Sequence, residues 1–277
     1  MLRNILIAAS CLALLQACNP PVRLKPGNPK TGLDSTYYAG VAEVAKSVDL
    51  REAQFLAHIK VGDLGVSLDC KYPDVLDLAT RETRRIGGNL LVITEHTQNR
   101  NKSLCHRIKG DIYRIGSLEG LEPQIRWHPA RPLMTGDLRG KAPKNAEGLP
   151  PLDVAISCRI GGDYFKDAIL RTETLFFADS TYHSGDTLQQ ALQLRRAQLH
   201  FDLAELHARK LKSRLLDLGP DVRAITGQYR ELTLEQQERL RQERQAFDAE
   251  LNDSDNKSFV LDAWFARIQA QLLSMLA

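Results

Sequence analysis

Residues 186–219 read DTLQQALQLRRAQLHFDLAELHARKLKSRLLDLG, and their spacing decides the fold expected around them. Apolar side chains recur every three, four or seven residues, which is the repeat of an α-helix. Two neighbouring stripes result, one of Leu188, Leu192, Leu199, Leu203 and Leu206, the other of Ala197, Phe201, Ala204, Ala208, Leu211 and Leu215. Because adjacent stripes make a wide apolar face, the stretch predicts a long central helix, about 50 Å at ~1.5 Å per residue.

The same stretch contains part of a metal-binding motif. A zinc peptidase helix reads H-E-x-x-H, in which two histidines one turn apart bind the ion and the glutamate is the base. Here the frame is Arg196-Ala197-Gln198-Leu199-His200, so only the second histidine is present. Arg196 stands in the place of the first ligand, and Ala197 in the place of the base.

The residues around this frame show a wider similarity. Residues 198–211, QLHFDLAELHARKL, resemble the active helix of a bacterial family described as predicted secreted zinc-dependent proteases of unknown function, which typically runs H-E-Q-x-H-F-D-I-A-E-x-x-A-R-K-L. Residues 131–141 resemble its opening R-P-L-T-W-x-D-F-x-G-K, and residues 247–250, FDAE, its later Y-D-x-E-T-x-H-G. Trp264 and Ile268 fit its closing W-x-x-x-I. The resemblance covers roughly residues 125–277 and implies a zincin-like domain.

The departures from this family fall on its implied site residues. Asp253 stands about where the family has its later histidine. His207 lies roughly 10 Å beyond His200 along a helix with ~1.5 Å rise per residue, so one ion cannot join the two rings. Arg196 cannot bind a metal ion and Ala197 cannot act as a base. The sequence therefore predicts no catalytic residue and no cofactor, with residual zinc at His200 at most.

A further hypothesis gives Arg196 a role in a site that holds no metal. In a cleft without metal, its guanidinium would take the place of the cation and pair with Asp253. The competing interpretation is that Arg196 is exposed to solvent. The resemblance further implies that Asp202 and Glu205 are structural residues.

Residues 1–18 are expected to be a signal peptide. A short basic start precedes an apolar run over residues 5–15, which is too short to span a bilayer. The run ends in LQAC, and Cys18 in this context resembles the acylated cysteine of bacterial lipoproteins. The resemblance implies membrane lipid as a partner and, because Asn19 follows, an outer-membrane location facing the periplasm. The alternative is an ordinary signal peptide with an incidental cysteine.

The cysteines that remain after residues 1–18 fit an exported protein. Cys70 and Cys105 are predicted to form a disulfide, which an oxidising compartment permits. The alternative is a metal site made by these two cysteines with His96 and His106, although no C-x-x-C spacing supports it. Cys158 is expected to be a buried free thiol.

The length of the chain allows two domains, and its strand and helix patterns, together with the resemblance, predict an α+β fold. The chain has 277 residues and a net charge of +3, too small to indicate a nucleic-acid partner. Residues 19–36 hold four prolines and two glycines and are expected to form a flexible tether. Residues 37–118 predict a small disulfide-linked β-α-β-β domain, whose helix is capped by Asp74. For residues 125–277 the resemblance implies the helix-rich zincin-like domain, with a small sheet.

Two more helices are expected in this second domain. Residues 233–236, TLEQ, have the pattern of a capping box and predict a helix from Thr233 to about Leu251. Its outward face is rich in Glu, Gln and Arg, as on a solvated helix. Residues 258–275 predict the final helix.

These features favour a lipid-anchored protein of the bacterial cell envelope. Its degenerate zinc-peptidase-like domain is expected to bind or support another envelope protein without cleaving it, as a pseudoenzyme does. One alternative is an active metallopeptidase with atypical ligands. Another is an envelope sensor or assembly lipoprotein that acts through the small domain.

Overall fold

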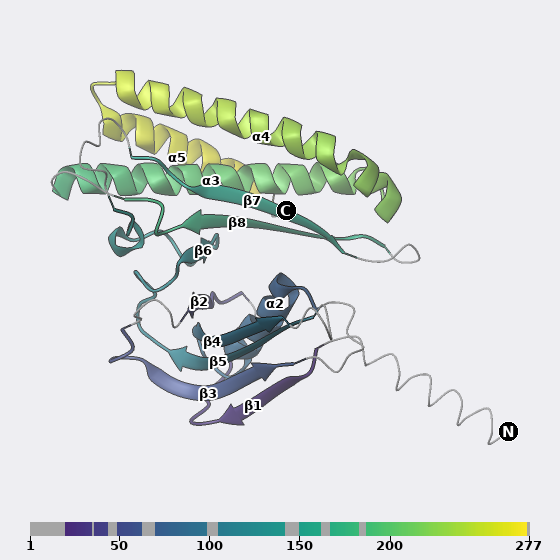
Figure 1. Cartoon of the computed structure of the whole chain (residues 1–277). Helices are drawn as coiled ribbons and strands as arrows, with labels where there is room; N and C mark the ends of the chain where they lie inside the picture. The colour runs from purple at the N-terminus through teal and green to yellow at the C-terminus, as the bar shows by residue number, and fades with distance from the viewer. Residues whose placement is uncertain are drawn as a thin grey trace. The chain divides into compact units, whose positions relative to one another are not determined.

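The chain forms two compact units, Met1–Pro123 and Gln124–Ala277 (Figure 1). The computed structural model describes residues 20–34, 36–43, 49–62, 70–98, 105–141, 150–161, 167–182 and 187–275. The predicted signal peptide and the lipidated Cys18 lie outside the described residues. Among the residues described, no helix is apolar over a length that could cross a bilayer. Helices and strands occur in both units, which confirms the α+β class.

The first unit is a five-stranded sheet with one helix packed on it. Its elements are β1 (Val22–Pro26), β2 (Gly40–Glu43), β3 (Gln54–Val61), α2 (Tyr72–Arg85), β4 (Leu90–Gln98) and β5 (His106–Arg114). The strand order is β1-β3-β5-β4-β2, with β2 parallel to β4 and the other pairs antiparallel. Val75 and Ala79 of α2 pack against apolar side chains of β3, β4 and β5.

The structure corrects the expected tether. Residues 22–26 form strand β1, which pairs with β3 and places Val22 opposite Val61. The prediction of a flexible tether over 19–36 is therefore wrong for this segment. Because β1 is an edge strand, proline is tolerated there, so the proline-rich composition was compatible with pairing.

The start of α2 also differs from the expectation. The N-cap residue is Lys71, which makes no side-chain capping bond, and Asp74 lies inside the first turn. The predicted cap by Asp74 is therefore wrong. Pro73 explains the start of the helix, because proline at the first helical positions lacks only an N–H that would have no helical partner.

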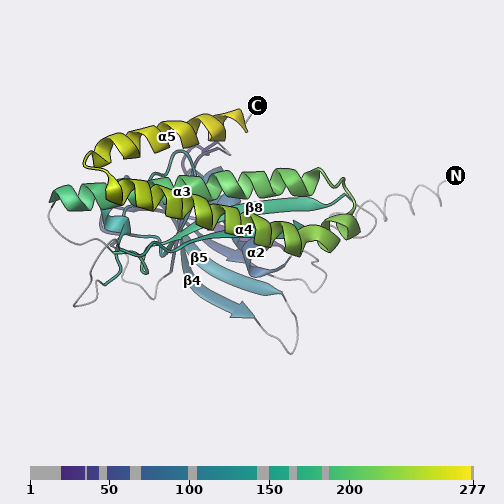
Figure 2. The ribbon, with the colours of Figure 1, turned by 90° about the horizontal axis from the view of Figure 1, so that it is seen from above.

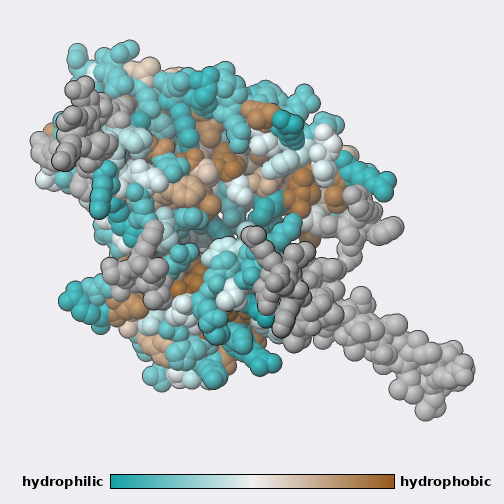
Figure 3. All heavy atoms as spheres, viewed as in Figure 1, coloured by the Kyte–Doolittle hydropathy of each residue, from teal (hydrophilic) through white to brown (hydrophobic). Residues whose placement is uncertain are grey.

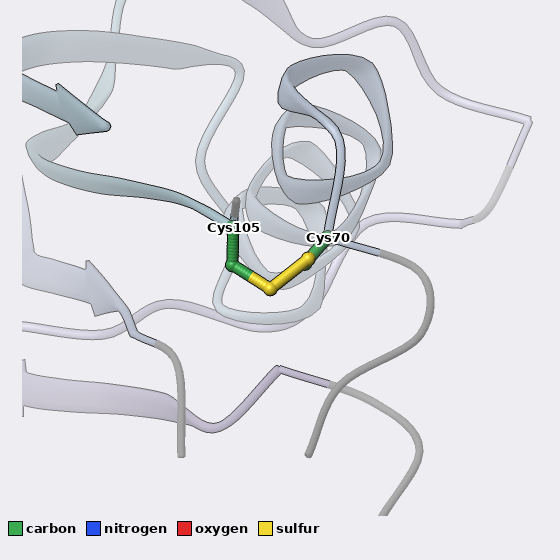
Figure 4. Close-up of a disulfide and its surroundings, with 2 residues drawn as sticks. All are labelled: Cys70 and Cys105. Atoms are coloured by element: carbon green, nitrogen blue, oxygen red, sulfur yellow. A yellow bond between two sulfur atoms is a disulfide. The ribbon is translucent and has the colours of Figure 1, made fainter. Parts of the chain in front are cut away.

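Cys70 and Cys105 form the predicted disulfide (Figure 4). Cys70 precedes α2 and Cys105 precedes β5, so the bond joins a helix to the sheet on which it packs. The Cα atoms are 4.8 Å apart, and the sequence separation is 35. His96 and His106 share a contact of 2.7 Å between Nε2 and Nδ1. With both sulfurs in the disulfide, the alternative metal site loses its thiolate ligands.

The second unit stacks a small sheet, a central helix and two outer helices (Figure 1). Its elements are β6 (Gln124–Arg126), the 3-10 turn η1 (Thr135–Asp137), β7 (Val154–Gly161), β8 (Ile169–Phe177), α3 (Thr187–Leu216), α4 (Val222–Asp253) and α5 (Lys257–Ser274). The sheet is antiparallel in the order β6-β8-β7, so β7 is an edge strand. Seen from above, α3 lies between α4 and α5 (Figure 2).

The two apolar stripes of α3 have different partners, which is why the helix is central. Leu203 and Leu206 pack with side chains of α4 and α5. Ala197 and Phe201 pack toward the sheet, against Phe176 of β8. The predicted central helix is confirmed, except that Leu188 at its start is 71% exposed.

Helix α4 begins at Val222 rather than at the predicted capping box. Asp221 is its N-cap, and the carboxylate accepts a hydrogen bond of 2.8 Å from the Arg223 N–H. The predicted start at Thr233 is wrong because an earlier cap already opens the helix after the Gly219–Pro220 turn. The outer face of α4 is hydrophilic, as expected (Figure 3).

Candidate functional site

Arg196 and His200 of α3 meet Asp248 of α4. The two α3 residues are one turn apart and share a face of the helix. Arg196 donates from Nε to Asp248 Oδ1 at 2.7 Å and from Nη2 to Oδ2 at 2.8 Å. His200 Nε2 lies 3.0 Å from Asp248 Oδ1, and Arg196 Nη1 donates to the Pro150 carbonyl at 2.8 Å. One carboxylate therefore joins two of the residues singled out in the sequence.

Asp248, and not Asp253, is the partner of Arg196. Asp253 is the last residue of α4 and is exposed, so the predicted pairing is wrong. The physical reason is helical phase, because five residues turn a side chain by about 140° around the helix axis. The interpretation of Arg196 as solvent-exposed is also wrong, since the residue is 7% exposed.

Burial and hydrogen bonding set the charges of this network. Burial alone would raise the pKa of Asp248, but hydrogen bonds from Arg196 and His200 hold that pKa below its ordinary value. Burial lowers the pKa of His200, and Asp248 opposes this only in part. At neutral pH the network is thus a guanidinium–carboxylate pair with a neutral imidazole, which donates from Nε2 because a carboxylate only accepts.

A pocket of about 540 Å³ opens beside this network. Its walls come from α3, α4 and the strand β7 with the residues before it. The apolar lining includes Leu152, Val154, Ile156 and Leu240. Among the described residues that line it, the charged groups are the guanidiniums of Arg196, Arg241 and Arg244 and the carboxylate of Asp248.

The donor set of this pocket does not fit a zinc ion. A catalytic zinc takes three protein ligands and keeps one open position. Here the donors are His200 and Asp248, and Asp248 is held at both oxygens by Arg196, whose charge would repel a cation. Within the described ranges, no group of three or more His, Cys, Asp and Glu side chains is placed to hold a metal ion.

Ala197 does not face the pocket. It is fully buried in a cluster that contains Leu133, Phe176 and Phe201, between α3 and the sheet. A carboxylate at this position would enter the apolar core, where an unpaired charge is strongly disfavoured. The position that corresponds to the catalytic base is therefore structural in this chain.

Asp202 and Glu205 of α3 bind side chains of other elements of the second unit and of α3 itself. Asp202 accepts hydrogen bonds from Trp127 Nε1 at 2.8 Å, Gln198 Nε2 at 2.8 Å and Gln269 Nε2 at 3.0 Å. Glu205 accepts from Thr174 Oγ1 at 2.9 Å and from Arg209 Nε at 2.8 Å. These contacts fasten α3 to its neighbours and leave neither carboxylate available for catalysis.

His207 belongs to a second network, separate from the pocket lining. Its Nε2 lies 2.8 Å from Glu243 Oε2, and its Nδ1 lies 2.7 Å from Gln236 Nε2. The hydrogen bond from His207 lowers the pKa of Glu243 despite partial burial. Both ring nitrogens are therefore used to hold α3 and α4 together.

Residues 131–141, which resemble the opening motif, have a structural role. Arg131 and Asp137 make a bidentate ion pair, with distances of 2.9 and 3.0 Å, and both side chains are buried. Gln198 of α3 accepts from the Leu133 N–H at 2.7 Å. This segment thus fixes the turn that packs on α3 and stays outside the pocket lining.

Sequence reasoning missed Asp248 and Arg244 as site residues. Leu240, Arg244 and Asp248 are spaced by four residues on α4, so they share one face with one another. That spacing was a usable signal, but it does not say which neighbouring element the face meets. No family model, no curated protein and no solved structure matches this chain, so the chemistry of the pocket carries the functional assignment.

Proposed function

We propose that this protein is a lipid-anchored protein of the bacterial cell envelope, with a degenerate zinc-peptidase-like second unit that binds a partner without cleaving it. The observation that carries the proposal is the bidentate ion pair between Arg196 and Asp248, with His200 on the same carboxylate. A guanidinium is permanently charged, so the network has its own cation and needs no metal ion for neutrality.

The chemistry of these residues favours binding over hydrolysis. Cleavage of a peptide bond by a zinc peptidase needs an activated water and a base that can take its proton. Ala197 has no titratable group, and Asp248 is held in an ion pair. The pocket keeps what binding needs, which is an apolar wall beside fixed charges.

The cell-envelope part of the proposal rests on the N-terminal sequence and on the disulfide. The lipobox-like end at Cys18 supports acylation, outer-membrane attachment facing the periplasm and membrane lipid as a partner. Acyl chains anchor because each buried CH₂ contributes ~0.8 kcal/mol. The Cys70–Cys105 bond is typical of proteins in an oxidising compartment such as the periplasm. The second partner is then another envelope protein.

The test is the zinc content of the chain without residues 1–18, purified without chelators and without a metal-binding tag. We expect less than about a tenth of an equivalent of zinc and no change in thermal stability when zinc is added, since a ligand stabilises only the state that binds it. The control is His200→Ala, which should give the same low content. Stoichiometric zinc that disappears in His200→Ala would contradict the proposal and favour an active metallopeptidase.

A further inference from the structure

Arg244 is a cation of the pocket that has no carboxylate partner among the described residues. Its Nη2 reaches only the His200 carbonyl, at 3.5 Å, and its Nε is buried without a hydrogen-bond partner there. Arg196 is held by Asp248, and Arg241 binds Glu238 at 2.6 and 2.7 Å. A buried donor that lacks an acceptor is unfavourable, so the site around Arg244 is suited to an added anion.

The electrostatic surroundings of Arg244 point the same way. Burial lowers the pKa of Arg244, and the neighbouring charge of Arg196 adds to this effect against the opposing attraction of Asp248. The guanidinium nevertheless remains charged at neutral pH. Because Asp248 is held at both oxygens by Arg196, it compensates the charge of Arg244 only in part, and an incoming anion would be attracted to this guanidinium.

The opposite wall of the pocket offers backbone groups. Directly before strand β7, the Asp153 carbonyl accepts from the Phe177 N–H at 2.9 Å, on the side of β8. The Cys158 carbonyl accepts from Tyr229 Oη of α4 at 2.8 Å, on the other side. Backbone groups alternate between the two sides of a strand. Val154 and Ile156 therefore direct their N–H and C=O groups away from β8, along the edge that lines the pocket.

We infer that the pocket binds the carboxyl terminus of an extended apolar peptide, with its carboxylate on Arg244 and its backbone beside Val154 and Ile156. A guanidinium binds a carboxylate through two parallel charged hydrogen bonds. A peptide also pairs with this edge of the strand, beside which no further strand lies among the described residues, whereas a fatty acid would cover the backbone groups without satisfying them. Leu152 and Leu240 provide apolar contacts for its side chains.

This inference rests on the proposed function, because a catalytic centre in the same pocket would cleave the peptide. The experiment is a fluorescence-polarisation titration of the purified protein with the labelled peptide GSAVAVL, made once with a free carboxyl terminus and once as the amide. We expect the free acid to bind about tenfold or more tightly than the amide, the factor for one charge-assisted hydrogen bond. Arg244→Gln should abolish this difference.

The matched control is Arg239→Gln, which removes a charge from the same helix outside this pocket and should preserve the difference. Equal binding of acid and amide would overturn the inference, as would absence of binding up to about 1 mM of either peptide. Decanoate that competes as well as the peptide acid would also overturn it. The comparison of acid with amide on the unchanged protein stands even where Arg244→Gln fails to fold.

Mass spectra of the peptide after the titration separate the two proposals. An intact peptide without preference for the free acid contradicts only the carboxylate site. A cleaved peptide contradicts the proposed non-catalytic function, whatever its affinity.

Discussion

The buried charge of Arg196 is tolerated inside the second unit because Asp248, which is also largely buried, forms an ion pair with it. The side chains of Arg196 and Asp248 are 9% and 27% exposed. Removal of one partner from a fully buried ion pair costs roughly 3–5 kcal/mol, and partial access of water to Asp248 reduces this. The pair thus contributes more to which face of α4 packs against α3 than to the net free energy of unfolding.

We predict that Arg196→Met destabilises the protein by about 2–3 kcal/mol, because Asp248 then loses its main counter-ion. The double variant Arg196→Met/Asp248→Leu should recover a large part of this loss, since no charge remains unpaired. Urea unfolding of the four proteins in the cycle measures the coupling. Strictly additive effects of the two substitutions would show that the ion pair is energetically irrelevant.

His200 makes stability depend on pH. Its folded pKa is lowered by burial, so just below the ordinary value of 6.5 the unfolded chain binds a proton that the folded chain does not. Its contribution is therefore fully present above pH ~6.5 and is lost as the pH falls below it. We predict a drop in melting temperature from pH 7.5 to pH 5 that is smaller in His200→Gln. Equal drops in both proteins would rule out His200 as the source.

Ala197 is a residue at which introducing the glutamate of an H-E-x-x-H motif is expected to harm the fold. Ala197→Glu should destabilise the protein by about 3 kcal/mol or more, because it buries a carboxylate in an apolar cluster. Ala197→Ser is the control, because serine is polar but close to alanine in size, and it should cost less stability. Thermal unfolding measures both effects. A stable Ala197→Glu protein would mean that this side chain reaches the pocket or solvent.

At the scale of elements, the start of α4 shows what a local pattern can miss. Asp221 caps the helix, whereas Thr233 lies within it with a buried hydroxyl that lacks a partner among the described residues. We predict that Asp221→Ala costs about 1 kcal/mol, the usual value of a lost N-cap. Thr233→Ala should cost much less, because no capping bond is lost. Chemical denaturation of both variants checks this, and a larger loss for Thr233→Ala would contradict the assignment.

The elements that could be predicted from the sequence include the long helix α3 and the β3-α2-β4-β5 series of the first unit. Helix α3 is buried on two sides, so its stripes extend over many turns and identify it. Strand β2 has four residues, too few to show alternation, and β1 could not be recognised because it ends in one proline and follows two others. At the site, Arg196 and His200 came from one motif on one helix. Their pairing with Asp248 depends on how α4 is rotated against α3. Because the sequence of α4 is mostly polar, this rotation cannot be read from it.

At the scale of the whole molecule, the disulfide links stability to redox state in one unit only. Cys70 and Cys105 lie in the first unit, and the second unit contains Cys158 as a free thiol whose pKa is raised by burial. A closed loop of this length stabilises by about 3–4 kcal/mol in the chain-entropy description. The two units therefore respond differently to a reductant.

We predict that reduction lowers the melting temperature of the first unit and leaves that of the second unchanged. Differential scanning calorimetry with and without reductant measures both transitions. The variant Cys70→Ala/Cys105→Ala should reproduce the reduced state and should not respond to reductant. A shift of both transitions by the same amount would show that the two units unfold as one.

If Cys18 carries the acyl chains proposed above, strand β1 also limits how far the first unit can move from the bilayer. It begins at Val22, and the four residues from Cys18 reach at most about 14 Å when fully extended. With the acyl chains proposed for Cys18, the folded first unit would remain at the headgroups and diffuse laterally along the leaflet. Encounters with other membrane-bound partners would then depend on their surface density and not on their concentration in the surrounding fluid.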